Sequence, residues 1–216
     1  MEDHKFEQDY FKEKHFAGIQ GYDLLTKLNL WRPRKYKDLI VQHATPNHKT
    51  LLDIGCAFGH FLEILNDDFE IKGIDISEHA IRVARSRLNC ELKKCNIEKE
   101  GIPFKEKFDI ISMISVLEHL NEPKRVLEDV YDKLNDGGLF CFEVPTISNF
   151  VSKIFYKLFF SKDESHIYIK SVDHIEALVQ SVGFKKVFTR SSMFPIFSKI
   201  KNVIDSFSFI FCIFQK

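Results

Sequence analysis

Cysteine is scarce in this chain, and none of it is spaced for a metal site or a redox pair. The 216 residues contain five cysteines, at Cys56, Cys90, Cys95, Cys141 and Cys212. Their odd number and the lack of a C-x-x-C pair argue against a disulfide framework or a structural zinc site, and favour reduced thiols in the cytoplasm. The fold must therefore be held together by a hydrophobic core.

An excess of charge of one sign and a long apolar run are also missing. The formal net charge is zero, so the composition gives no general attraction to nucleic acid. No run reaches the roughly 18 apolar residues that span a bilayer, and the nearest approach, residues 203–214, contains Asp205 and two serines. The N-terminus lacks the apolar core of a secretion signal. These absences predict a cytoplasmic protein without a membrane span.

The apolar residues that are present follow the periods of an α/β fold. Short apolar runs predict strands at residues 50–54, 70–74, 91–95, 108–114, 139–144 and 184–190. Segments of helical period lie at residues 59–65, 77–88, 123–134 and 171–182. Strands that alternate with helices favour right-handed crossovers around a mostly parallel sheet with helices on both faces, which is a three-layer, Rossmann-like architecture.

The loop after the first predicted strand carries the most informative residues. It reads Asp53-Ile-Gly55-Cys56-Ala57-Phe58-Gly59, and its glycines let the backbone approach a ligand closely. A dinucleotide site would need G-x-G-x-x-G, but Ala57 and His60 stand at two of the glycine positions, which disfavours a nucleotide-dependent oxidoreductase. Asp53 would repel a pyrophosphate, yet it suits a ligand that carries ammonium and sulfonium charges.

Two further strand ends offer groups that suit a nucleoside. Asp75 follows the second strand, where a carboxylate can accept hydrogen bonds from two ribose hydroxyls. Asn96 follows the third strand and offers both a donor and an acceptor to an adenine edge, and Ile97 can pack on the ring.

Residues 51–144 resemble the class I S-adenosylmethionine-dependent methyltransferases, in particular those that methylate small metabolites, quinones, lipids and glycans. The family's D-x-G-C-G-x-G motif appears here with Ala57 in place of the middle glycine, its ribose acid matches Asp75, and Asn96 replaces its adenine-reading acid. The resemblance implies S-adenosylmethionine as cofactor and S-adenosylhomocysteine as product. It places the cofactor on Asp53, Gly55, Cys56, Ala57, Gly59, Asp75, Ile76, Asn96, Ile97 and Ser115.

The same resemblance implies a seven-stranded sheet whose last strand is antiparallel, which we assign to residues 184–190. Residues 1–47 then form an N-terminal helical cap outside the core, and residues 48–192 form the methyltransferase domain. A substrate-side insertion lies at about residues 146–170, and within it residues 150–160 are suited to an amphipathic lid. Residues 193–216 are a Phe-rich extension.

Two histidines are candidates for a general base on the acceptor side. His119 either removes a proton or anchors its loop by hydrogen bonds, and we favour the anchor. His166 precedes the helix that lies beside the substrate in relatives, and the alternative is a surface histidine. Some relatives bind a divalent metal ion through E-x-x-E-H, but Ser115 stands at the position of the first Glu, so we predict no catalytic metal.

The C-terminal third combines aromatic and basic residues. Residues 150–216 hold 12 of the 22 phenylalanines, and ten Lys or Arg against five Asp or Glu. This composition suits peripheral contact with an anionic membrane or a lipid-linked substrate, but packing in the core or in a homodimer is the interpretation that we favour, and the chain is expected to be a monomer or a homodimer.

These observations predict an enzyme that methylates a hydroxyl oxygen of a small-molecule, glycan or lipid-like acceptor. The alternative is a non-catalytic or degenerate partner subunit that binds S-adenosylmethionine, and Ala57 and Asn96 are the departures that leave it open.

Overall fold

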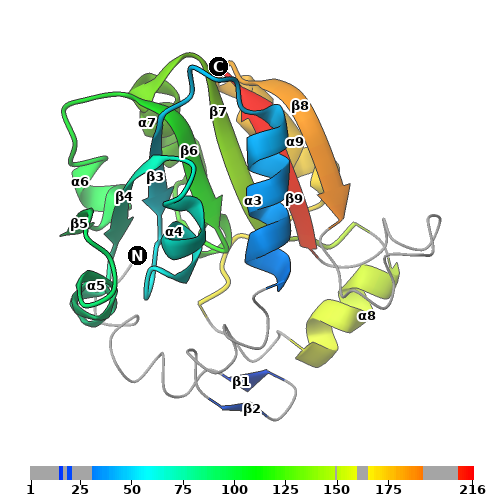
Figure 1. Ribbon diagram of the computed structural model, residues 1–216. Helices are drawn as coiled ribbons and strands as arrows, with labels where there is room; N and C mark the ends of the chain where they lie inside the picture. The colour runs from blue at the N-terminus through cyan, green and yellow to red at the C-terminus, as the bar shows by residue number, and fades with distance from the viewer. Residues whose placement is uncertain (1–14, 17–18, 21–30, 149, 160–164, 192–208) are drawn as a thin grey trace.

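Seven strands form one mixed sheet in the computed structural model, which describes residues 15–16, 19–20, 31–148, 150–159, 165–191 and 209–216 (Figure 1). Across the sheet lie β5 (Glu91–Lys94), β4 (Glu70–Asp75), β3 (Thr50–Ile54), β6 (Phe108–Ile114), β7 (Leu134–Pro145), β9 (Phe209–Gln215) and β8 (Lys185–Ser191). The first five strands are parallel to one another, and β9 runs antiparallel to both of its neighbours. The predicted seven-stranded sheet with an antiparallel last strand is confirmed.

The antiparallel strand is β9, however, so its assignment to residues 184–190 was wrong. That segment forms the edge strand β8, while β9 lies between β7 and β8. In β9 the side chains of Phe211, Cys212 and Ile213 are 1% exposed or less. Its continuous apolar run is the pattern of a strand covered on both faces, which the assignment of residues 193–216 to a Phe-rich extension overlooked. Residues 209–215 thus belong to the sheet of the domain, and the rest of the predicted extension up to residue 208 lies outside the described residues.

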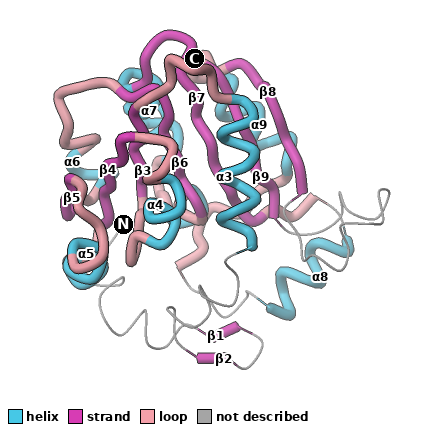
Figure 2. The backbone as a smooth tube through the Cα atoms, in the orientation of Figure 1, coloured by secondary structure: helices cyan, strands magenta, loops and turns pink. Residues whose placement is uncertain are grey.

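Helices cover both faces of the sheet, as the alternating pattern predicted (Figure 2). The helices α3 (Trp31–His43), α4 (His60–Leu65) and α5 (Glu78–Arg85) pack into one hydrophobic cluster on one face. On the other face, α6 (Ile97–Glu100), α7 (Pro123–Lys133) and α9 (Val172–Ser181) pack into a second cluster. Serine caps fix two of these helices: Ser77 accepts from the backbone of Ala80 at 3.2 Å, and Ser171 accepts from that of His174 at 3.3 Å.

Residues 31–43 of the N-terminal region are helical, but this helix is not a cap outside the core. Tyr36 and Ile40 of α3 are 2% and 0% exposed, and the Tyr36 ring stacks on Phe211 of β9 with 4.4 Å between the ring centres. Helix α3 is therefore part of a core layer, and it connects the N-terminal region to the last strand. The short antiparallel pair β1 (His15–Phe16) and β2 (Ile19–Gln20) precedes it.

Helix α8 (Phe150–Phe159) lies on the side of the molecule where the parallel strands end. Figure 1 shows α8 and the β1–β2 pair beyond the edge of the sheet at which the arrow of β8 ends. Phe150 and Ile154 of α8 are 76% and 45% exposed. The predicted amphipathic segment is thus a helix on the side of the sheet where ligands bind in such folds. Among the described residues, no helix is long and apolar enough to cross a membrane.

Candidate functional site

The turn after β3 is shaped by two glycines that adopt a left-handed backbone conformation. Gly55 and Gly59 both have φ of +76°, and a Cβ built on Gly55 would lie 2.2 Å from a methyl carbon of Val116. The backbone N–H groups of Gly55 and Cys56 donate to the carbonyl of Ile74 at 2.8 and 3.0 Å, which ties the turn to the end of β4. The loop is therefore held against the neighbouring strand end in the left-handed conformation that glycine tolerates.

Ala57 occupies the place of the family's middle glycine and adopts the backbone of a glycine. Its φ is +45°, a region that costs an L-residue roughly 1–2 kcal/mol. The N–H of Ala57 donates to Oδ2 of Asp75 at 2.8 Å, and this bond compensates for part of the strain. The substitution thus preserves the shape of the loop.

Asp75 links the glycine loop to the end of β4. Besides accepting from Ala57, Asp75 accepts from the backbone N–H of Ser77 through Oδ1 at 2.9 Å. Asp75 is 8% exposed. The two bonds fix the plane of the carboxylate, and a carboxylate has about four acceptor positions. Ile76, which is partly exposed, follows it directly.

Asp53 lies next to Asp75 at the adjoining strand end and is more deeply buried. It is 3% exposed, and it accepts a hydrogen bond from the hydroxyl of Ser112 on β6 at 2.7 Å. Burial raises the pKa of Asp53 to about 7, the bond from Ser112 lowers this pKa, and the charge of Asp75 raises it. A carboxyl group with such a pKa is poised to gain its charge when a cation binds beside it.

Two of the predicted cofactor residues have their side chains engaged within the protein. Asn96 caps α6, because its side-chain oxygen accepts from the backbone of Glu98 at 3.2 Å while its own N–H donates to Glu100 at 2.8 Å. Cys56 is 4% exposed and packs in the core, and burial raises the pKa of its thiol well above the usual range. Ile97 is 5% exposed. Cys56 thus acts as a small hydrophobic residue of the core.

Glu143 forms a buried polar junction that the sequence did not predict. It lies at the carboxyl end of β7, is 2% exposed, and accepts from the hydroxyl of Tyr36 at 2.8 Å and from that of Ser115 at 3.2 Å. Arg32 of α3 forms an ion pair with the same carboxylate. Ser115 has a φ of +54°, and its backbone N–H also donates to the carbonyl of Glu143 at 3.0 Å. A charged residue inside the apolar run of residues 139–144 was the signal that could have revealed this junction.

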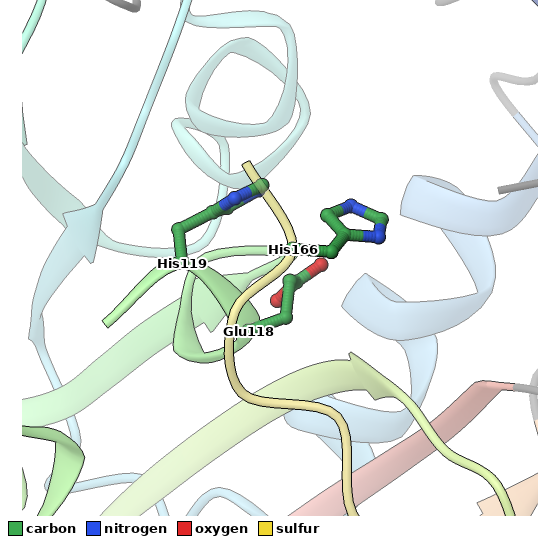
Figure 3. A group of neighbouring side chains, drawn as sticks. All are labelled: Glu118, His119 and His166. Carbon is green, nitrogen blue, oxygen red and sulfur yellow. The ribbon is translucent and has the colours of Figure 1, made fainter. Parts of the chain in front are cut away.

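Three side chains that can move a proton or bind a metal ion meet just beyond Ser115 (Figure 3). Glu118 and His119 lie in the short helix η2 (Leu117–His119), and His166 comes from the segment before α9. One potential ligand atom from each residue lies within 4.8 Å of the other two. Glu118 and His119 are 1% and 6% exposed. This group, which we call the Glu118 cluster, brings together the two histidines that the sequence offered as candidate bases.

Both imidazole rings of the cluster are oriented through Nδ1. In His119 this atom lies 2.9 Å from the carbonyl oxygen of Ser165, and because a carbonyl only accepts, Nδ1 carries the proton and Nε2 is the basic nitrogen of the neutral ring. In His166, Nδ1 lies 2.9 Å from the hydroxyl of Tyr156 on α8. His119 therefore anchors the loop and also presents a basic nitrogen, so both of its predicted roles are compatible with the geometry.

Comparisons with known proteins agree with this architecture. Residues 28–188 match the family described as a methyltransferase domain. An uncharacterised protein of Methanocaldococcus jannaschii is 35% identical over 146 residues, which are 67% of this chain and 55% of that protein. The mitochondrial ubiquinone biosynthesis O-methyltransferase of Candida albicans is 36% identical over 98 residues, 41% of this chain and 30% of that enzyme. This chain thus spans about half the length of the first of these relatives, and less of the second.

A solved structure shows the same fold at lower identity. The S-adenosylmethionine-dependent methyltransferase from Archaeoglobus fulgidus superimposes with a TM-score of 0.67 at 18% identity, over 90% of this chain and 99% of that one. This likeness agrees with the sheet order and the two helical layers described above.

Proposed function

Since this chain belongs to the methyltransferase domain family and carries a class I S-adenosylmethionine-dependent methyltransferase domain, we propose that it methylates a hydroxyl oxygen of a small-molecule, glycan or lipid-like acceptor. The observation that carries the proposal is the pair of carboxylates at adjoining strand ends, Asp53 on Ser112 and Asp75 on the glycine loop. The charge of Asp75 disfavours the ionised form of Asp53 in the empty site, and a ligand with cationic groups and a ribose suits both acids.

The residues at the different strand ends would bind different parts of the cofactor. Asp53 would attract the ammonium group, and Asp75, held by two backbone N–H groups, would accept hydrogen bonds from the ribose hydroxyls. The loops of Gly55 and Ser115 would contact the methionine end. The adenine would lie near Asn96 and Ile97. These residues would contact the ring more than they would hydrogen-bond to it, because the side-chain oxygen of Asn96 already caps a helix.

Methyl transfer from a sulfonium needs alignment more than covalent help from the protein. Holding the acceptor oxygen in line with the bond between sulfur and methyl carbon can contribute about 7–11 kcal/mol in favourable cases. A hydroxyl acceptor must also lose its proton, and Nε2 of His119 is the basic atom that the Glu118 cluster offers for this step. The relative from Candida albicans, an O-methyltransferase, supports oxygen as the acceptor atom.

Binding and turnover test different parts of the proposal. Calorimetry with S-adenosylmethionine and with NADH should show binding of the first compound alone, and tight NADH binding would contradict the proposal. A panel of phenolic, glycan and lipid hydroxyls should yield a methylated product together with S-adenosylhomocysteine. Cofactor binding without product from any acceptor would favour the alternative, a partner subunit that binds S-adenosylmethionine.

Asp75 allows a sharp test of the cofactor site. Asp75→Ala should weaken S-adenosylmethionine binding by about 1–3 kcal/mol, the cost of leaving polar partners without a hydrogen bond. Asp75→Asn keeps the side-chain volume but has one acceptor oxygen in place of two, so it can keep only one of the two backbone bonds, and its affinity should lie between those of the unaltered chain and Asp75→Ala. An unchanged affinity in Asp75→Ala would show that the ribose binds elsewhere.

A further inference from the structure

We propose that the Glu118 cluster is a binding site for a divalent transition-metal ion, with Glu118, His119 and His166 as the three protein ligands. One ligand-type atom of each residue lies within 4.8 Å of the other two, and Figure 3 shows the three side chains gathered around one region. Two imidazoles and one carboxylate form a donor set that zinc and related ions bind, and three protein ligands leave a coordination position for another molecule.

The hydrogen bonds around the cluster are those that metal-binding histidines make. A histidine that binds a metal through one nitrogen usually donates its other N–H to a carbonyl, a carboxylate or water, which fixes the ring. In His119 the outer partner is the carbonyl of Ser165, and in His166 it is the hydroxyl of Tyr156. Both bonds engage Nδ1, so Nε2 is the atom of each ring that would bind the ion.

The backbone holds the third ligand in place. The carbonyl oxygen of Glu118 accepts hydrogen bonds from the N–H groups of Ile167 and Tyr168, both at 2.9 Å. These two residues directly follow His166, so the segment that carries this histidine is fixed to η2 by main-chain contacts. The position of His166 beside Glu118 and His119 therefore does not depend on side-chain contacts alone.

Sequence spacing could not reveal this set. Our prediction of no catalytic metal rested on Ser115, which stands where relatives with E-x-x-E-H have their first Glu, and whose hydroxyl instead bonds to Glu143. His166 comes from 47 positions beyond His119, after α8, and offers the third donor from another direction. Two His ligands favour zinc, cobalt or nickel over magnesium. When bound, the ion would occupy Nε2 of His119 and replace this atom as the group that promotes loss of the acceptor proton, because a Lewis acid lowers the pKa of a hydroxyl that it binds. Only this last statement rests on the proposed function.

Metal binding can be measured without the cofactor and without an acceptor. The full chain is stripped with a chelator, dialysed and titrated with Co²⁺ while the visible absorption is recorded, and Zn²⁺ is then added as competitor. We expect one equivalent of Co²⁺ per chain, displaced by Zn²⁺ and not by an excess of Mg²⁺. Absence of stoichiometric Co²⁺ and Zn²⁺ binding would overturn the proposal.

Variants locate the ion. His166→Asn and Glu118→Gln keep the approximate volume of each side chain and should abolish stoichiometric binding, whereas His48→Ala, a histidine in the turn before β3, should leave it unchanged. Tyr156→Phe removes only an outer hydrogen bond and should weaken binding about 10- to 100-fold. Stoichiometric binding that survives both His166→Asn and Glu118→Gln would place the ion elsewhere and refute the site.

A fold control keeps these results interpretable. The S-adenosylmethionine affinity of His166→Asn should equal that of the unaltered chain, because His166 lies outside the proposed cofactor site. Loss of metal binding with intact cofactor binding thus supports the site. If neither form binds the cofactor, the proposed function fails, while the Co²⁺ titration still decides the metal site.

Discussion

The pH dependence of cofactor binding should report the charge of Asp53. Burial raises the pKa of this carboxyl to about 7, so below pH 7 the empty site holds a mostly neutral acid. If the ionised form pairs with the ammonium group of S-adenosylmethionine, binding must draw Asp53 into its charged state. The affinity should therefore fall as the pH decreases through 7, because the free energy of deprotonation is then taken from binding.

The expected size follows from the position of the pKa. For a site that binds only with Asp53 ionised, the apparent Kd should rise about 25-fold between pH 7.5 and pH 5.5. Over this range the ligand's own amino group stays mostly charged, because its ordinary pKa lies near 8. S-adenosylhomocysteine carries the same ammonium group and should show the same slope.

Two variants separate Asp53 from other titrating groups. Asp53→Asn should bind weakly with little change across this range, since no carboxyl remains to ionise. Ser112→Ala removes a hydrogen bond that favours the ionised form, so it should move the midpoint to higher pH. A Kd that is constant from pH 5.5 to 7.5 in the unaltered chain, or a slope that persists in Asp53→Asn, would refute the pairing of Asp53 with the ligand's amine.

The remaining predictions concern stability and can be checked by urea unfolding. Without cofactor, the raised pKa of Asp53 means that the folded state binds more protons than the unfolded state between about pH 4 and 7. The free energy of unfolding should therefore fall by about 4 kcal/mol as the pH rises through this window, and level off above it. Asp53→Asn should abolish the fall. Ala57→Gly relieves a positive φ and should stabilise the fold by up to about 1 kcal/mol, whereas Ala177→Gly on the exposed face of α9 should cost about 0.5–1 kcal/mol. Glu143→Gln leaves the guanidinium of Arg32 without its carboxylate and should lower the free energy of unfolding by about 1–3 kcal/mol. Tyr36→Phe removes only a neutral donor and should lower it by about 1 kcal/mol. Equal effects of the two variants would contradict a charged junction.

The sequence predicted the parts of the site that lie within one strand and its following loop. The six strands and four helices read from apolar periodicity are all present, with ends that differ by a few residues, since burial on a parallel sheet leaves a direct pattern in the chain. The largest difference in bounds is at β7, which begins at Leu134 instead of residue 139 because Asn135 to Gly138 loop out within the strand. Strand β9 is a short apolar run of the same kind, but it was missed because it was assigned to the Phe-rich extension of residues 193–216.

Contacts between distant segments were beyond the reach of such patterns. Glu143 meets Tyr36 across 107 positions, and His166 meets η2 through the bonds of Ile167 and Tyr168 to Glu118. No local period records these pairings, because the order of strands in the sheet brings them together. Only the presence of an acid within a buried strand hinted that Glu143 needed a partner.

Glu143 also connects the two halves of the proposed site. One oxygen of its carboxylate accepts from Tyr36 of α3. The other accepts from Ser115, whose positive φ shapes the turn between β6 and the Glu118 cluster. Because Tyr36 stacks on Phe211, the position of Ser115 depends on the docking of α3 against β9, which is far from either loop in the sequence. A change in the packing of α3 should therefore alter the geometry of Ser115 more than that of Asp75, because the hydrogen bonds to Asp75 come from Ala57 and Ser77.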